Sequence, residues 1–133
     1  VVPEAMIAAE EGVKRMHDAT EGGVLGGLME MCVANRISAR VETSKIPVAP
    51  ETDAICGRLG IDPLKLIGSG SLLCVFAPEA AGRVAQRFRA DGIPSARIGT
   101  VERVGKAKVV LVTGSREEEM KGFPTDELWG AIL

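Results

Sequence analysis

Two glycine pairs, Gly22-Gly23 and Gly26-Gly27, fall within a stretch that otherwise has the pattern of a buried helix. Its apolar residues recur every three to four positions: Val24, Leu25, Leu28, Met29 and Cys32. Each glycine destabilises a helix interior by about 1 kcal/mol relative to alanine, so these glycines require compensating contacts. Because residues four positions apart share a helix face, the glycines form a stripe without side chains, along which another backbone or a ligand can approach closely.

A strand-to-helix turn is predicted just before this stripe. Residues 13–18 have the pattern of a strand, and Thr20 is expected to cap a helix that ends at Asn35. Exposed amides at a helix start bind anions, and the helix dipole strengthens that binding. One interpretation is therefore a phosphate or nucleotide site at which Asp18, Thr20 and Glu21 position metal, water or phosphate. The other is tight packing of the helix on a sheet, with an ordinary threonine cap.

Two further features near the turn also allow a functional and a structural interpretation. The loop Gly68-Ser69-Gly70 precedes an apolar run, and it either binds an anion through its backbone or simply turns the chain. His17, the single histidine, either takes part in chemistry or is a hydrogen-bonded structural residue, and its isolation favours the structural role.

The remaining pattern predicts a mixture of helices and strands. Helices are predicted over residues 3–11, 20–35, 51–59, 78–91 and 125–132, with a shorter one opening at Asp62-Pro63. Strands are predicted over residues 13–18, 37–42, 72–77, 96–103 and 107–113. We expect 72–77 to be a buried central strand, 96–103 and 107–113 to form a hairpin, and the last helix to bury Trp129. The whole predicts one domain over residues 1–133, either α+β or three-layered, with a mixed β-sheet.

Composition excludes several classes of protein. With 46% hydrophobic and 26% charged residues over 133 positions, the chain is globular in type and of single-domain size. A net charge of −2 without a basic run, and few aromatic residues, argue against a nucleic-acid partner. No stretch approaches the roughly 20 apolar residues of a membrane span, so we expect a soluble, cytoplasmic protein without a membrane partner. The three cysteines are widely spaced with apolar neighbours, which predicts buried thiols and no metal site.

Several sequence blocks resemble those of one known family and follow one another in the same order. Residues 16–23, Met-His-Asp-Ala-Thr-Glu-Gly-Gly, resemble the Asp-Pro-Thr-Arg-Gly-Gly element of the hydrogenase maturation (HypE) family. Residues 45–51 and 59–64, followed by the loop that contains Ser69, resemble the next segments of that family in the same order. The resemblance runs from about residue 13 to 112, and it identifies the chain as similar to the C-terminal domain of the aminoimidazole ribonucleotide (AIR) synthase superfamily.

This resemblance implies an α+β fold with three α/β/α layers and a mixed β-sheet, like that of the AIR synthase C-terminal domain. It also implies an ATP-dependent enzyme with phosphorylated intermediates. In that superfamily an N-terminal domain, which this chain lacks, dimerises and holds most of the ATP and Mg²⁺ site, while the C-terminal domain closes over the phosphates. On that pattern Asp18, Thr20, Gly22 and Gly23 are expected on the nucleotide side. Ser69 and Gly70, from the second glycine loop, complete the expected phosphate-binding set. We assign no catalytic residue, and we expect the isolated domain to be inactive and the full-length form to be a homodimer.

Three departures bear on that implication. Glu21 stands where the HypE pattern has arginine, and the chain ends at Leu133 without the C-terminal cysteine on which HypE acts. The chain also starts at Val1 rather than at methionine, from which we expect either one domain of a longer protein or a processed product. The alternative to an ATP-dependent enzyme of unknown substrate is a stand-alone ligand-binding or assembly module without catalysis.

Overall fold

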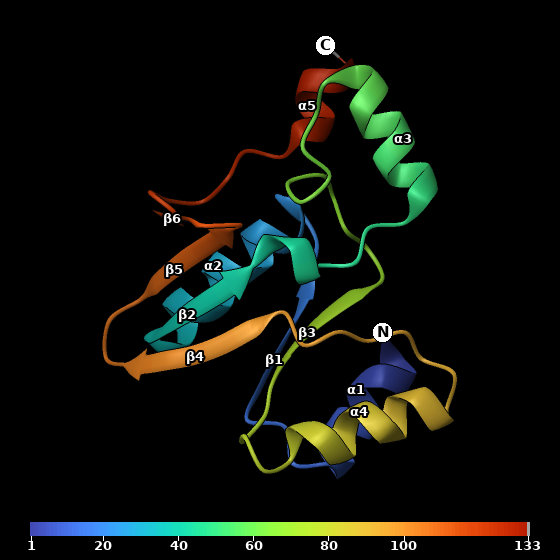
Figure 1. Ribbon diagram of the computed structural model, residues 1–133, viewed down its shortest axis with the longest axis vertical. Helices are drawn as coiled ribbons and strands as arrows, with labels where there is room; N and C mark the ends of the chain where they lie inside the picture. Colours follow the sequence, from blue (N-terminus) through green and yellow to red (C-terminus); the bar gives the residue numbers. More distant parts are fainter. Residues whose placement is uncertain (133) are drawn as a thin grey trace.

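Six strands form two separate sheets in the computed structural model, which describes residues 1–132 apart from the Arg103 side chain. The strands are β1 (Arg15–Ala19), β2 (Ile37–Glu42), β3 (Ser71–Val75), β4 (Gly99–Val104), β5 (Lys108–Thr113) and β6 (Arg116–Glu119). The helices are α1 (Val2–Glu10), α2 (Gly23–Asn35), α3 (Pro50–Leu59), α4 (Ala81–Ala90) and α5 (Glu127–Ile132), with a short 3₁₀ turn at Thr43–Lys45. The predicted α+β class is confirmed (Figure 1).

The larger sheet is mixed, as expected, but its strand order differs from the prediction. Its order is β4-β2-β5-β6, with β2 antiparallel to β4 and parallel to β5. The predicted hairpin of 96–103 with 107–113 is therefore wrong, because β2 lies between these two strands. The hairpin forms instead between β5 and β6, where Thr113 faces Arg116. The polar segment that follows β5 thus becomes an edge strand. Its acidic side chains suit an edge that is exposed to water.

The apolar run in 72–77 is not a central strand. It becomes β3, which pairs only with β1 in a two-stranded antiparallel ribbon. Leu73 packs in the cluster around α2, whereas Cys74 packs against the cluster formed by α1 and α4. The ribbon thus has helices on both faces, α2 on one and α1 with α4 on the other. The run is apolar on both sides because its two faces meet two different helical layers.

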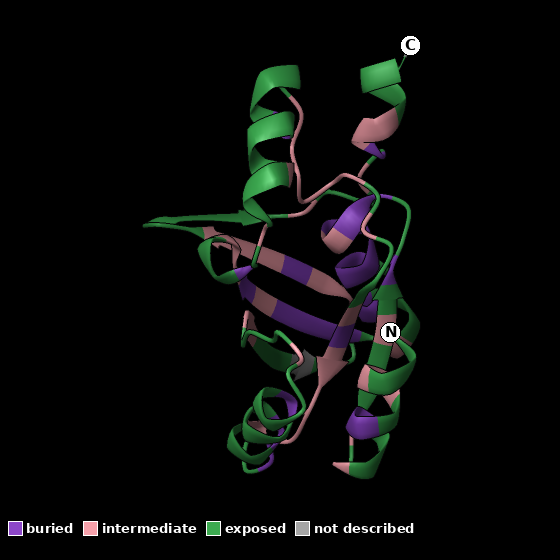
Figure 2. Ribbon diagram, turned by 90° about the vertical axis from the view of Figure 1, so that its right-hand side faces the viewer, coloured by how far each residue is buried: buried purple, intermediate pink, exposed green. Residues whose placement is uncertain are grey.

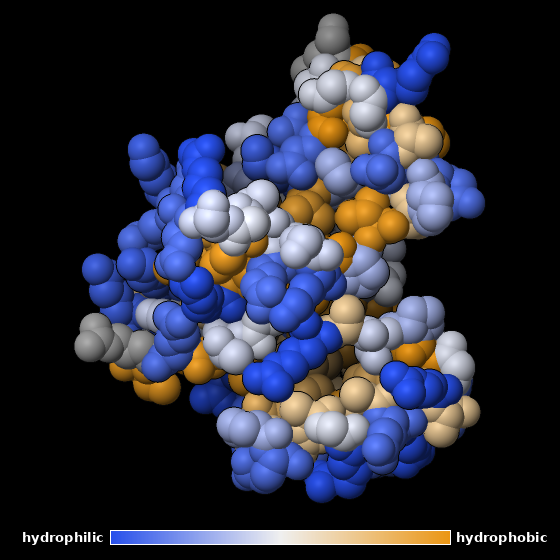
Figure 3. All heavy atoms as spheres, viewed as in Figure 1, coloured by the Kyte–Doolittle hydropathy of each residue, from blue (hydrophilic) through white to orange (hydrophobic). Residues whose placement is uncertain are grey.

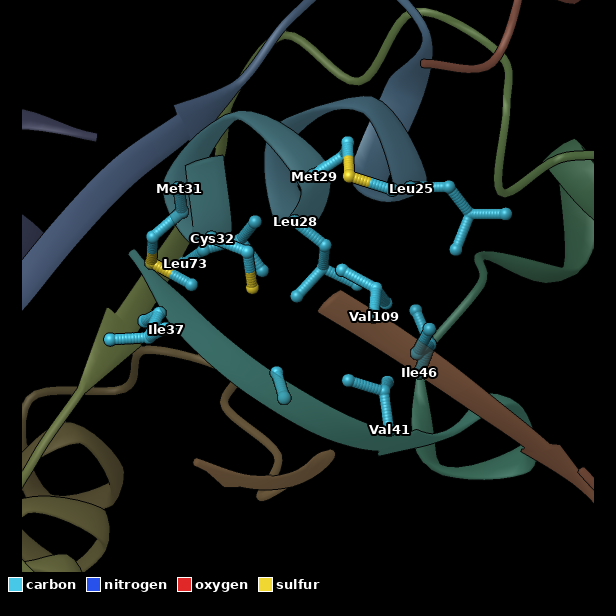
Figure 4. Close-up of a cluster of buried hydrophobic side chains, with 11 residues drawn as sticks. Leu25, Leu28, Met29, Met31, Cys32, Ile37, Val41, Ile46, Leu73 and Val109 are labelled. Carbon is cyan, nitrogen blue, oxygen red and sulfur yellow. The ribbon is translucent and has the colours of Figure 1, made fainter. Parts of the chain in front are cut away.

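Helix α2 lies between the ribbon and the mixed sheet and contributes more residues to the main core than any other element. That core contains Leu25, Leu28, Met29, Met31, Cys32, Ile37, Ala39, Val41, Ile46, Leu73 and Val109 (Figure 4). The alternation of Ile37, Ala39 and Val41 with polar residues directs these three side chains of β2 toward α2, as the period-two pattern predicts. The glycine-bearing helix is therefore buried between two β layers (Figure 2).

Helices α3 and α5 lie at one end of the molecule, opposite α1 and α4 (Figure 1). Trp129 is 52% exposed, so the predicted burial of this side chain by the last helix is wrong. Ile55 and Leu59 of α3 and Ile132 of α5 are also exposed, and hydrophobic residues show at the surface at this end of the molecule (Figure 3).

The helix predicted to open at Asp62 is also wrong. The Asp62 carboxylate accepts the Leu64 N–H at 3.0 Å, and the Asp62 carbonyl accepts the Lys65 N–H at 3.0 Å. These bonds close a turn in place of the predicted helix.

The cysteine prediction holds in the described residues. Cys32, Cys56 and Cys74 are free thiols, the first two buried and the third partly buried. Burial raises the pKa of the Cys74 thiol to about 11. None of the helices within residues 1–132 is long and apolar enough to cross a membrane.

Candidate functional site

The two glycine segments singled out in the sequence lie side by side in the structure. Because β1 and β3 pair with Ala19 opposite Ser71, the chain leaving β1 runs next to the chain entering β3. The Thr20 carbonyl accepts hydrogen bonds from both segments: the Gly23 N–H at 3.1 Å and the Gly68 N–H at 3.2 Å. We call residues 18–23 with residues 68–70 the glycine site.

The polar residues of the glycine site are exposed to solvent. Asp18, Thr20, Glu21 and Ser69 are all exposed, as is Gly70. Neither carboxylate forms an ion pair with a cation of the described residues. The site therefore offers two free hydroxyls and two free carboxylates to an incoming ligand.

The start of α2 differs from the prediction in its capping. The residue before the helix is Gly22, which has left-handed backbone angles (φ 72°), and no side chain caps the helix, so the expected cap by Thr20 is wrong. A left-handed conformation favours glycine because a Cβ would crowd the following carbonyl. Thr20 contributes its carbonyl rather than its hydroxyl, which leaves the hydroxyl free.

Protein oxygens already accept hydrogen bonds from amides at the start of α2. The Gly22 N–H donates to Asp126 Oδ2 at 2.7 Å, a buried contact between residues far apart in the sequence. The Gly23 N–H donates to Thr20, and the Leu25 N–H donates to the Leu64 carbonyl at 3.1 Å. An anion that uses the Gly22 N–H therefore has to replace the Asp126 carboxylate.

The glycine stripe is used for close packing. A Cβ built on Gly23 would lie 2.5 Å from the Leu66 carbonyl oxygen and 2.6 Å from that of Leu64. A Cβ on Gly27 would lie 3.2 Å from Leu73 Cδ1 and 3.3 Å from Ala19 Cα. The backbone of the 64–66 turn and the β1–β3 ribbon thus approach α2 where side chains are missing, which compensates the helix for its glycines.

His17 has the structural role that the sequence favoured. Its Nε2 lies 2.7 Å from Glu30 Oε2 on α2, and both side chains are partly exposed. The pair joins the ribbon to the helix and leaves the histidine outside the glycine site. No group of three metal-ligating side chains comes together in the part of the chain that the structure describes.

Asp126 is the residue that sequence reasoning missed. Its Oδ1 accepts the Leu128 N–H at 2.9 Å, the geometry of an ordinary aspartate cap at the start of α5. That role can be read from an aspartate placed just before a predicted helix. The contact of Oδ2 with Gly22 cannot be read in this way, because it depends on how the chain end folds back.

Comparison with known proteins identifies the family of the chain. Residues 1–112 match the family described as "AIR synthase related protein, C-terminal domain". The chain belongs to this family. Among relatives, carbamoyl dehydratase HypE of Rhizobium leguminosarum bv. viciae is 34% identical over 115 residues, which cover 85% of this chain and 33% of the relative. Carbamoyl dehydratase HypE of Escherichia coli K12 is 33% identical over 97 residues, covering 71% and 29%.

Solved structures of HypE share the fold. A crystal structure of E. coli HypE superposes with a TM-score of 0.81 at 27% identity, covering 98% of this chain and 41% of that chain. A crystal structure of HypE in complex with ATP gives a TM-score of 0.75 at 28% identity, covering 89% of this chain and 39% of that one. The resemblance to HypE-like AIR synthase relatives is therefore confirmed. The AIR synthase-related domain spans about a third of the length of the curated relatives it matches.

Proposed function

We propose that this domain is the C-terminal part of an ATP-dependent enzyme similar to HypE, and that its glycine site closes the phosphate end of the nucleotide site. Membership of the AIR synthase-related family supports the proposal, as does the fold shared with a HypE that was solved with ATP. The observation that carries it is the convergence of the Gly22-Gly23 turn and the Gly68–Gly70 loop on the Thr20 carbonyl. Thr20 and Ser69, one from each segment, are both exposed.

Each residue of the glycine site has a role in this proposal. The hydroxyls of Thr20 and Ser69 donate to phosphate oxygens, and Gly70 keeps the loop close to the ligand without a side chain in the way. Gly22 and Gly23 hold the turn in the left-handed conformation that orients these groups. The Asp18 carboxylate lies near the metal ion that accompanies the nucleotide.

The exposed carboxylates fit a Mg²⁺ ion that accompanies ATP. Magnesium in nucleotide sites takes one or two carboxylates together with phosphate oxygens and water. Asp18 and Glu21 would be the two carboxylates. Because the Glu21 carboxylate would repel a phosphate beside it, a cation has to lie between the carboxylate and the phosphate. When bound, the ion neutralises phosphate charge, and the remaining ligands come from the other domain.

The other domain also carries the groups that act on the substrate. The full-length protein then works as a homodimer through that domain, and the 133-residue chain alone has no turnover. Its task is to cover the phosphates and keep water away from them.

The test uses the natural full-length protein that contains this domain. Thr20→Ala and Ser69→Ala should each weaken Mg-ATP binding about tenfold, since each removes a hydrogen bond to a charged group. Ser115→Ala, an exposed serine in the β5–β6 turn, is the matched control and should leave binding unchanged. Calorimetry measures the dissociation constants. Unchanged binding in both site variants would show that the glycine site does not contact the nucleotide.

A module without catalysis is the second candidate, favoured by the Asp126 carboxylate on the Gly22 N–H and by the anionic Glu21. On this alternative the glycine site is closed permanently and the domain binds another ligand or subunit. Absence of ATP binding and ATP turnover in the full-length wild-type protein would favour this candidate.

A further inference from the structure

The last segment of the chain folds back over the glycine site and is held there by one carboxylate. Asp126, only 7% exposed, accepts the Gly22 N–H at 2.7 Å through Oδ2. Its Oδ1 accepts the Leu128 N–H at 2.9 Å and the Ile67 N–H at 3.4 Å. One buried side chain therefore joins three parts of the chain: the turn before α2, the segment before β3, and the start of α5.

Other contacts of this segment with the rest of the domain are few and mostly polar. The Glu127 N–H donates to the Lys65 carbonyl at 3.3 Å, and the two side chains lie 3.8 Å apart as an exposed ion pair. Pro124 lies over Gly22, where an added Cβ would meet the proline carbonyl oxygen at 3.2 Å. Trp129, by contrast, leaves half of its surface in water. Exposed ion pairs contribute little, so the Asp126 carboxylate is the stronger of the two charged attachments of the segment.

We propose that residues 124–128 form a C-terminal latch, in which Asp126 occupies the Gly22 N–H until a nucleotide phosphate replaces it. The inference rests on the function proposed above, which places a phosphate at the glycine site. A phosphate at hydrogen-bond distance from the Gly22 N–H would lie beside the Asp126 carboxylate, and the two anions would repel one another in this buried place. Phosphate binding and latch docking therefore exclude one another, so the nucleotide frees α5 from the glycine site.

The latch has two readouts that do not depend on catalysis. Hydrogen–deuterium exchange of the 120–132 peptide reports whether the segment is docked, because release exposes its amides to water. Exchange in residues 20–28 reports the hydrogen bond of the Gly22 N–H. Both are measured on the natural full-length protein, with and without Mg-ATP, by mass spectrometry.

Asp126→Ala removes both accepting oxygens, and Asp126→Asn keeps one of them without the charge. We expect exchange in 120–132 to rise about tenfold in Asp126→Ala, and Mg-ATP to bind about tenfold more tightly because no carboxylate competes. Asp126→Asn should give the same changes at smaller size. Glu127→Gln changes a neighbouring charge that does not touch Gly22, and it should behave as wild type.

In the wild-type protein, Mg-ATP should raise exchange in 120–132 while it protects residues 20–28. If ATP binds and 120–132 stays protected, or if Asp126→Ala binds ATP no more tightly, the latch is refuted while the ATP function stands. If wild type and Asp126→Ala both fail to bind ATP, the proposed function and the latch fall together. If Asp126→Ala does not fold, the exchange of residues 120–132 in the wild-type protein, with and without Mg-ATP, still tests the latch.

Discussion

Replacing Gly23 by alanine tests the claim that the glycine stripe exists to let backbone approach α2. The added Cβ would lie 2.5 Å from the Leu66 carbonyl oxygen and 2.6 Å from the Leu64 carbonyl oxygen. Ordinary carbon–oxygen contacts lie near 3.3 Å, so the 64–66 turn has to move by several tenths of an ångström. That movement also stretches the hydrogen bond from the Leu25 N–H to the Leu64 carbonyl.

The expected cost has two parts. Gly23 has a φ of 63°, and an alanine in this left-handed region costs about 1–2 kcal/mol. Crowding in a packed interior adds about 1–3 kcal/mol. Gly23→Ala should therefore lower the free energy of unfolding by about 2–5 kcal/mol, a large part of the stability of a domain of this size.

Urea unfolding of the 133-residue chain, followed by circular dichroism, measures this loss. Gly57→Ala is the matched control, because Gly57 lies in α3 and a Cβ there meets nothing within 4 Å. That substitution should raise stability by about 0.5–1 kcal/mol. A Gly23→Ala variant within about 0.5 kcal/mol of wild type would refute the argument that close backbone packing requires this glycine.

The remaining predictions concern charge, thiol chemistry and the core. A bidentate hydrogen bond from Arg40 lowers the pKa of Glu117 below its usual 4.5. The pair therefore stabilises the fold above pH 4.5, and this stabilisation is lost as the pH falls through the lowered pKa. Arg40→Gln should therefore flatten the acid side of the urea midpoint against pH, and an unchanged profile would contradict the pairing. The pKa of the Cys74 thiol is about 11, so little of it is thiolate at neutral pH. Its reaction with a disulfide reagent should therefore be roughly a hundredfold slower in the folded chain than in urea, and equal rates would contradict its burial. Val109→Ala should cost about 1–3 kcal/mol in urea unfolding, since Val109 of β5 is 0% exposed in the core that it shares with α2. A loss near zero would mean that the site collapses around the smaller side chain.

The local elements and the family could be predicted from the sequence. Apolar spacing placed α2, and the alternation of Ile37 with its neighbours placed β2. These signals are local, because helix and strand periods act over a few residues. The ordered blocks around Gly22-Gly23 identified the AIR synthase-related family without any structure, because several motifs in one order are far more specific than one.

Strand partners and the state of the glycine site could not be predicted in this way. The run in β3 looks like a central strand, since a strand between two helical layers is as apolar as one inside a large sheet. The pairing of β2 with both β4 and β5 depends on strands that are distant in the chain. Sequence spacing carries no record of such partners.

By itself, then, the sequence determined the elements, the family and the two glycine segments that form the site. Only the tertiary structure decided that these segments meet at the Thr20 carbonyl, and that the stripe from Gly23 to Gly27 is filled by backbone and side chains of the same chain. Only the tertiary structure also brings Asp126 to the Gly22 N–H. The physical reason is that hydrogen bonds and close packing between distant segments depend on where the whole chain folds back, whereas period and composition report only each residue's immediate neighbours.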